Sequence, residues 1–110
     1  MDSYTIIMTS DAIDDVTDLR NYIADVLGAP ETALAYIRTV RKEIGSLAEM
    51  PARYKPVDDE PWHSRGIRRL LVKNSFVYYR IDESARKVFI MNVIYARRDQ
   101  LRAMAEIKLD

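Results

Sequence analysis

The residues with the clearest chemical potential are arginines that occur in two adjacent pairs, Arg68-Arg69 and Arg97-Arg98. Their planar guanidinium groups suit bidentate contacts with phosphate oxygens, and such groups can stabilise negative charge that develops on a phosphate during a reaction. On a strand, adjacent side chains point to opposite faces, so only one of the first pair can line a given groove. The nucleic-acid or partner surface is expected to include three more basic residues: Arg65, Lys73 and Arg80.

The charge of the chain is divided unevenly along its length. Residues 1–61 hold 6 Lys/Arg and 12 Asp/Glu, a net charge of −6, whereas residues 62–110 hold 11 Lys/Arg and 5 Asp/Glu, a net charge of +6. Such asymmetry indicates an acidic or phosphate-bearing partner for the basic half. The alternative is internal compensation, in which Arg68, Arg97 and Arg98 pair with aspartates of the N-terminal half.

The composition excludes several kinds of site. With no cysteine and one histidine, the chain has no disulfide, thiolate site or histidine-rich metal centre. Three glycines do not make a phosphate-binding loop, and the consecutive carboxylates of residues 58–60 lack the spacing of a calcium loop. His63 follows Trp62, which fits a loop anchored on the core better than a catalytic role. We therefore expect neither a metal nor a cofactor.

The length and hydropathy of the chain indicate one compartment and one domain. No apolar run approaches the ~18 residues of a membrane-spanning helix, and the N-terminus has no positive charge ahead of an apolar segment, as a signal peptide would. We therefore expect a cytoplasmic protein that does not engage a membrane. A chain of 110 residues fits a single domain over residues 1–110.

Two helices are expected in the first half of the chain. Residues 9–11 (TSD) supply capping oxygens for the first helix, and apolar residues recur every three or four positions over residues 13–26. Gly28 is typical of the left-handed residue that ends a helix. Pro30 suits the first turn of a second helix, which Pro51 is expected to end. The short connection predicts an antiparallel helical hairpin.

Four strands are expected from β-rich runs at residues 4–8, 67–72, 76–81 and 88–95. Short turns join the last three into an antiparallel meander, and the almost entirely apolar last run is typical of a central strand. A short helix is expected over residues 99–107. The predicted fold is therefore α+β, a small antiparallel sheet of the meander plus the N-terminal strand at an edge, packed against the helical hairpin.

Several short phrases resemble the RelE/ParE toxin superfamily, and together they cover nearly the whole chain. These phrases are residues 21–24 (NYIA), 29–33 (APETA), 46–51 (SLAEMP), 66–68 (GIR), 77–82 (VYYRID) and 93–99 (VIYARRD). The resemblance implies a small sheet that carries a helical hairpin, and the toxin half of a bacterial type II toxin–antitoxin pair. It also implies a cognate antitoxin as partner, which masks a basic groove, and assembly as a homodimer or a toxin–antitoxin hetero-oligomer.

The resemblance leaves two alternative targets open. One branch of the superfamily cuts messenger RNA on the ribosome, whereas the ParE-like branch inhibits DNA gyrase and does not cut nucleic acid. The resemblance to the RNA-cutting branch makes Arg68, Arg97 and Arg98 the catalytic candidates. However, Ser75 or Phe76 stands where that branch has an arginine, and no tyrosine or histidine follows in the C-terminal segment. We therefore expect a ParE-like gyrase inhibitor, with a ribosome-dependent endoribonuclease and a degenerate, non-toxic binding module as alternatives.

Overall fold

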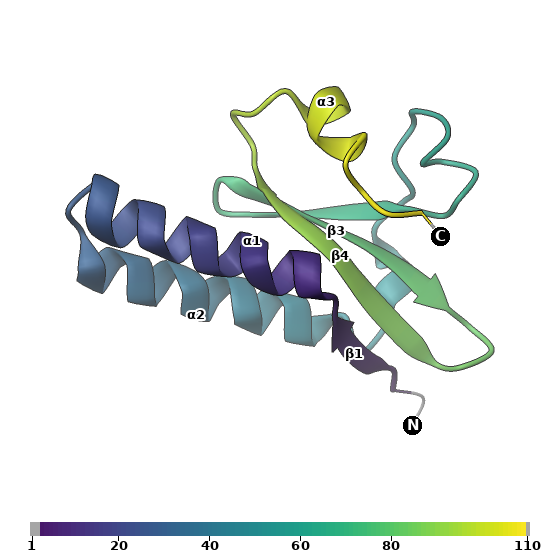
Figure 1. Cartoon of the computed structure of the whole chain (residues 1–110). Coiled ribbons are helices and arrows are strands. Elements are labelled where there is room, and N and C mark those ends of the chain that lie inside the picture. The colour runs from purple at the N-terminus through teal and green to yellow at the C-terminus, as the bar shows by residue number, and fades with distance from the viewer. Residues whose placement is uncertain (1–2, 110) are drawn as a thin grey trace.

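The computed structural model describes residues 3–109 of the chain. Its strands are β1 (Thr5–Met8), β2 (Arg68–Val72), β3 (Ser75–Asp82) and β4 (Lys87–Tyr95). They form one sheet in the order β1-β4-β3-β2. A helical hairpin covers one face of this sheet, and a short C-terminal helix and a long loop lie on the other side (Figure 1). This arrangement confirms the expected α+β fold. Among the described residues, no helix has the length and apolar character needed to cross a membrane.

The first helix, α1 (Ser10–Asn21), begins where the sequence predicts. The Thr9 hydroxyl accepts a hydrogen bond from the Ala12 N–H at 3.2 Å, which satisfies one of the free donors of the first turn. α1 continues into a single π-helical turn over Tyr22–Val26, which the sequence pattern did not indicate. Gly28, at φ +63°, then provides the predicted left-handed residue that ends the helix.

The second helix, α2 (Pro30–Ser46), begins at the proline that the sequence indicates. It ends before Pro51, so the expectation that this proline ends the helix is wrong; Pro51 instead opens a short 3₁₀ turn. Met50, at φ +53°, departs from helical geometry before Pro51, and the Arg53 guanidinium stabilises the earlier end, because it donates to the carbonyls of Ser46 and Glu49 at 3.2 and 2.8 Å. Carbonyls at the end of a helix lack partners within it, and this side chain supplies them.

The sheet contains the predicted meander, since β2 pairs with β3 and β3 with β4 in antiparallel fashion. β4 is central, as its apolar run predicted. β1 lies at the edge, but it pairs with β4 in parallel, so the sheet is mixed and not entirely antiparallel. The helical hairpin and the other strands separate β1 from β4 in sequence, and a connection of that length permits a parallel neighbour.

Each face of the sheet carries its own apolar cluster. The cluster under the hairpin consists of residues from both helices and all strands but β1: Ala12, Val16, Ile37, Val40, Ile44, Leu47, Leu70, Val72, Val77, Tyr79, Val88, Ile90 and Val93. The cluster on the opposite face lies under α3 (Gln100–Met104) and the loop before β2: Val57, Ile67, Tyr78, Met91, Ile94, Ala103, Met104 and Ile107. The adjacent tyrosines Tyr78 and Tyr79 belong to opposite clusters, and both are fully buried.

The long loop between α2 and β2 is anchored on the second cluster. The Trp62 Nε1–H donates to the Met104 carbonyl at 2.9 Å, and the ring packs on the cluster. The Nδ1–H of His63 donates to the Val57 carbonyl at 2.8 Å. The sequence-based interpretation of this pair as a loop anchor is therefore confirmed, and one of the two ring nitrogens of His63 is already engaged.

Candidate functional site

A β-bulge in β4 decides which backbone groups face the outer edge of that strand. Met91 has no partner in β3, because it lies between the residues that pair with Tyr78 and Tyr79. β1 ends opposite Ile90, so the second half of β4 has no neighbouring strand on that side. The Val93 N–H faces this open edge, since it donates to a side chain of α1 and not to β3.

Asp15 joins α1 to this strand edge. Its Oδ2 accepts hydrogen bonds from the Val93 N–H at 2.9 Å and from Asn92 Nδ2 at 3.0 Å. Burial raises the pKa of the Asp15 carboxyl above its ordinary value, and the two hydrogen bonds offset part of that rise. The Oδ1 of Asn92 is buried without a hydrogen-bond partner in the described residues. The contact therefore depends on one desolvated carboxylate that holds two donors of β4.

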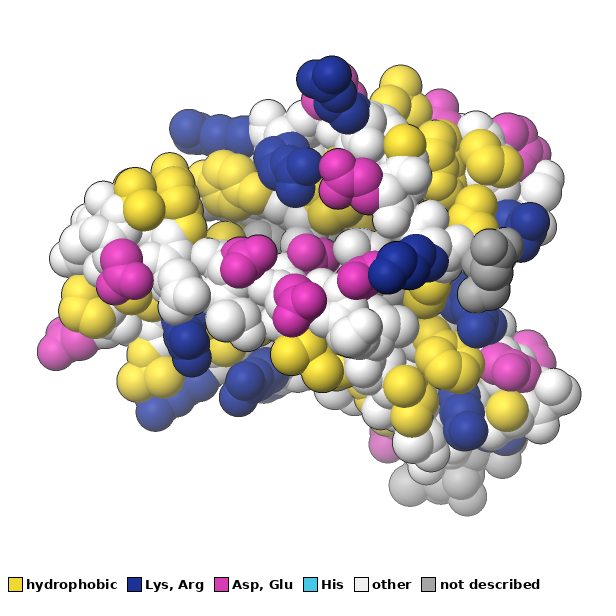
Figure 2. Space-filling model, in the orientation of Figure 1, with side chains coloured by type: hydrophobic (Ala, Val, Ile, Leu, Met, Phe, Trp, Pro, Cys, Tyr) yellow, Lys and Arg dark blue, Asp and Glu magenta, His cyan; other side chains and the backbone are white. Residues whose placement is uncertain are grey.

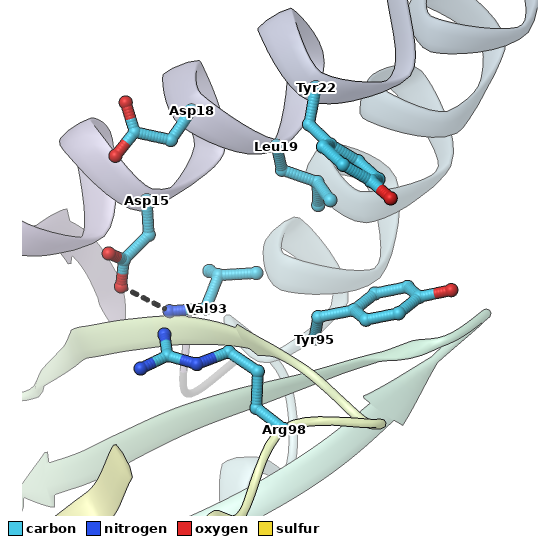
Figure 3. Close-up of a pocket in the computed structure, with 7 residues that line it drawn as sticks. All are labelled: Asp15, Asp18, Leu19, Tyr22, Val93, Tyr95 and Arg98. Atoms are coloured by element: carbon cyan, nitrogen blue, oxygen red, sulfur yellow. Dashed lines mark hydrogen bonds between the residues drawn. The ribbon is translucent and has the colours of Figure 1, made fainter. Parts of the chain in front are cut away.

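A groove of about 290 Å³ lies between α1 and the outer edge of β4, and we call it the α1–β4 groove. Its lining consists of Asp15, Asp18, Leu19, Tyr22, Val93, Tyr95 and Arg98. Leu19 and Tyr22 extend from the helix toward the strand, and Arg98 follows the end of β4 (Figure 3). In Figure 2, acidic side chains lie along α1 and basic side chains lie opposite them, with hydrophobic side chains between the acidic and the basic groups.

Arg68, a predicted catalytic candidate, is used inside the fold. Its guanidinium donates to the Tyr54 carbonyl at 2.6 Å and to the Ala52 carbonyl at 3.3 Å, so it fixes the start of the long loop. The end of β4 at Tyr95 is level with Val72 of β2, because both pair with Ser75 of β3. Arg68 lies four residues before Val72, which is about 13 Å along the strand. The expectation that Arg68 shares one open surface with the Arg97-Arg98 pair is therefore wrong.

Three further predicted arginines are also engaged by the chain itself. The Arg69 guanidinium lies over the Phe76 ring at 4.3 Å, and Arg80 lies over the Phe89 ring at 4.3 Å. Arg65 donates to the carbonyl of residue 109 at 3.0 Å. Internal compensation was the alternative to a functional basic groove, and for these arginines it occurs through aromatic rings and carbonyls and not through aspartates.

The remaining predicted residues gather at one end of the sheet, which we call the basic end (Lys73, Arg97 and Arg98). Lys73 occupies the β2–β3 turn at φ +56°, and the Asn74 carbonyl beside it accepts from the Ala96 N–H at 2.7 Å. The turn therefore lies next to the segment that carries the two arginines. All three basic side chains are exposed, and within residues 3–109 none of them forms a hydrogen bond or an ion pair.

The comparisons with known proteins agree with this architecture. The model of the family described as "ParE toxin of type II toxin-antitoxin system, parDE" matches residues 6–100. The chain belongs to this family.

Solved structures of toxins and toxin–antitoxin complexes share the fold of this ParE-family chain. The chromosomal ParDE system from P. aeruginosa is 17% identical over 88% of this chain and 100% of that one, with a TM-score of 0.72. The RelBE2 complex from Mycobacterium tuberculosis is 26% identical over 84% and 98%, with a TM-score of 0.60. A free E. coli RelE mutant is 12% identical over 92% of each chain, with a TM-score of 0.63. No curated protein sequence matches the chain.

In the described part of this ParE-family chain, the buried tyrosines Tyr78 and Tyr79 and the histidine His63 are engaged inside the fold and do not line the groove with Arg98. Cleavage of RNA through its own 2′-hydroxyl needs a base, a cation for the phosphate and an acid for the leaving oxygen. The hydroxyl of Tyr78 is bound to Gln100 Oε1 at 2.7 Å, and burial raises the pKa of Tyr79 to about 12. His63 lies in the anchored loop. In the described part of the chain, no group of three or more His, Asp or Glu residues is arranged to hold a metal ion.

The sequence identified only part of this site. Arg98 was among the predicted residues, but Asp15, Leu19, Tyr22 and Tyr95 were not. In the structure Asp15 lies in the second turn of α1 and binds β4. No local signal distinguishes it from the neighbouring aspartates, because its role depends on a strand that is more than 70 residues away in sequence.

Proposed function

We propose that this ParE-family toxin acts by binding a protein target, DNA gyrase, without cutting nucleic acid, and that a cognate antitoxin neutralises it. The proposal rests on one observation, which is that the sheet face opposite the helical hairpin is closed. α3 and the anchored loop cover that face with a buried apolar cluster. A nuclease that worked from the middle strands would need this face open to a phosphate.

The side chains of the covered face support this interpretation. Tyr78, at the middle of β3, is fully buried and donates its hydroxyl to Gln100 of α3. Arg69 and Arg80, which lie on the same face, are stacked on Phe76 and Phe89. A phosphate would therefore have to displace an aromatic ring from each guanidinium and remove α3 from Tyr78.

The basic end is the surface that we assign to target binding. Lys73 and Arg97 are exposed and have no partner within the described residues, so they can bind acidic groups of another protein without breaking internal contacts. Exposed charges of this kind raise association rates and fix orientation, and salt weakens their effect. Binding to the target should therefore weaken as the ionic strength rises.

Supercoiling of relaxed plasmid by purified gyrase tests the proposal. We expect micromolar toxin to inhibit the reaction, and the double variant Lys73→Glu/Arg97→Glu to require at least a tenfold higher concentration. Lys87→Glu is a matched control, because Lys87 is an exposed lysine at the opposite end of β4. Addition of the antitoxin encoded beside the toxin should restore supercoiling.

Three results would overturn the proposal in different ways. Unimpaired supercoiling at micromolar toxin would exclude gyrase as the target. Discrete breaks in translated messages, in a reaction with ribosomes, would establish the endoribonuclease alternative. The 26% identity to a chain of the RelBE2 complex is the reason to test it. Normal growth of cells that express the toxin without an antitoxin would indicate a degenerate binding module.

A further inference from the structure

The side chains of the basic end are placed by their backbone alone. Within residues 3–109, the side chains of Lys73 and Arg97 form no hydrogen bond or ion pair. The region that such a side chain can reach is set by the direction of its Cα–Cβ bond, and hence by the backbone conformation. The contacts that fix the backbone at Lys73 therefore decide whether its ammonium group faces a target.

Lys73 adopts a backbone conformation that is uncommon for lysine. It lies in the two-residue turn between β2 and β3 at φ +56°, in the left-handed region. In this region the Cβ atom comes too close to the following carbonyl oxygen, so residues other than glycine adopt it only at a cost. Such a conformation persists where surrounding contacts over-determine it, and these positions concentrate at functional sites. The conformation of Lys73 therefore depends on contacts from outside the turn.

Tyr36 of α2 supplies such a contact. Its hydroxyl oxygen accepts a hydrogen bond from the Asn74 N–H at 3.1 Å, and it forms a second hydrogen bond of 2.7 Å with the hydroxyl of Ser75, a fully buried residue. The Asn74 N–H belongs to the planar peptide group that joins Lys73 to Asn74, so this bond fixes the orientation of that plane. The Tyr36 ring packs on the cluster under the hairpin, which holds the hydroxyl in place. The helical layer therefore fixes the turn through this hydroxyl group.

The arginines of the basic end are held by a different residue. Gln100 Nε2 donates to the carbonyls of Tyr95 and Arg98 at 3.0 and 2.8 Å. The segment that carries Arg97 is therefore fixed from α3, even where the turn between β2 and β3 moves. Loss of the Tyr36 hydroxyl should act on the turn and leave the arginines in place.

We propose that Tyr36 is a positioning residue for target binding, whose hydroxyl holds the turn so that the Lys73 ammonium group faces an acidic group of the target. The inference rests on the proposed function, because that function assigns Lys73 to the surface that binds gyrase. Tyr36 acts only through the turn. A preorganised turn and side chain lose less conformational freedom on binding than mobile ones do. Removal of the hydroxyl should therefore weaken binding although the charge of the chain stays the same.

Tyr36→Phe tests the inference, because phenylalanine keeps the ring and removes the hydroxyl. In the ¹⁵N-labelled toxin alone, hydrogen exchange at the Asn74 amide should become about tenfold faster, and the amide spectrum reports whether the variant folds. In the supercoiling assay, the toxin concentration that halves gyrase activity should rise about fivefold. Tyr79→Phe is the matched control, since it removes a tyrosine hydroxyl that donates to the Pro51 carbonyl, about 13 Å along β3 from Ser75. This control should leave inhibition within about twofold of the parent chain.

A double-mutant cycle separates positioning from a general loss of stability. If Tyr36 acts through Lys73, Tyr36→Phe should add almost nothing to the loss caused by Lys73→Ala, whereas its loss should multiply with that of Arg97→Ala. Three results would overturn the inference: parental exchange at the Asn74 amide, equal inhibition by Tyr36→Phe and the parent chain, or a full additional loss in the Lys73→Ala background. Failure of the proposed function is a different result, in which the parent chain itself does not inhibit gyrase, and the role of Tyr36 in target binding then fails with it.

Discussion

Met104 is the residue whose loss tests most directly whether α3 keeps the second face of the sheet closed. Its side chain is 1% exposed, and its carbonyl accepts from the Trp62 Nε1–H. α3 has only five residues, and a helix of that length does not persist in water without packing. The position of α3 therefore depends on the apolar side chains that it buries, chiefly Met104 and Ile107.

The magnitude follows from these burials. Burial of two large apolar side chains contributes about 3–6 kcal/mol, and replacement of a buried methionine by alanine costs about 2–5 kcal/mol. Met104→Ala should therefore remove most of the free energy that docks α3. We expect residues 96–109 to open locally in this variant, with Tyr78 exposed beneath them, while the helical hairpin and its cluster stay folded.

Hydrogen exchange measured by mass spectrometry checks this prediction. A loss of about 2 kcal/mol corresponds to roughly thirtyfold faster exchange in a segment that opens locally. Leu101→Ala on the same helix is the control, because Leu101 is 54% exposed and its loss should change stability by less than about 0.5 kcal/mol. If protection in residues 96–109 falls only in step with that of α1 and α2, α3 belongs to the global folding unit and the reasoning is refuted. Ribosome-dependent RNA cleavage by Met104→Ala, but not by the parent chain, would show that closure conceals a catalytic site.

Four further substitutions test the contacts and backbone conformations that hold the fold. Burial raises the pKa of Asp15 above its ordinary 3.8, so the folded chain loses stability as the pH rises from 3.8 through the raised pKa. Asp15→Asn should abolish this part of the pH dependence of the unfolding free energy, measured by urea titrations between pH 3 and 7. An unchanged pH dependence would contradict the assignment. Tyr79 donates to the Pro51 carbonyl at 2.6 Å, so Tyr79→Phe should cost about 1–3 kcal/mol at pH 7. Because the pKa of Tyr79 is raised from 10.0 to about 12, its contribution is present below pH 10 and lost between pH 10 and 12, so the variant should show a shallower alkaline loss of circular dichroism. Gly28→Ala should lower the thermal midpoint through about 1–2 kcal/mol of left-handed strain, since the new Cβ meets nothing at φ +63°. Gly45→Ala, which is helical and equally unobstructed, should raise it through about 0.5–1 kcal/mol; shifts of the same sign would reject the backbone argument.

The elements that the sequence predicts well are those set by local chemistry. Thr9, Gly28 and Pro30 act within a few residues of their own positions, and each does what its residue type favours. The central position of β4 follows from a long apolar run that needs cover on both faces. The parallel pairing of β1 was not predictable in this way, because the hydrophobic pattern of a strand is the same for either direction of its neighbour.

The α1–β4 groove illustrates what the pattern of a single segment does not contain. Its unpaired edge exists because Met91 is one residue too many for the β3–β4 ladder and because β1 stops opposite Ile90. The position of Tyr22 on the helix side of the groove depends on a π-helical turn that begins at this residue. The bulge in β4 and the π-helical turn after α1 each change the regular geometry by about one residue, and the hydrophobic periodicity of α1 and β4 tolerates such a change.

The arginines show why a charge count alone does not locate a basic surface. A guanidinium group has five donors and a flat face, so neutral carbonyls and aromatic rings can bind it in place of carboxylates. Arg68 takes the first kind of partner and Arg80 the second, yet both still count as +1 in a sum over the C-terminal half. The net charge of +6 therefore includes cations that the fold has already used, and only side chains without such partners, such as Arg97 and Arg98, remain for a guest. Arg97 and Arg98 stand after the end of the most apolar strand and outside the sheet, whereas Arg69 and Arg80 stand on strands beside aromatic residues of the same face. This difference is the feature that a sequence reader can use to separate the two groups.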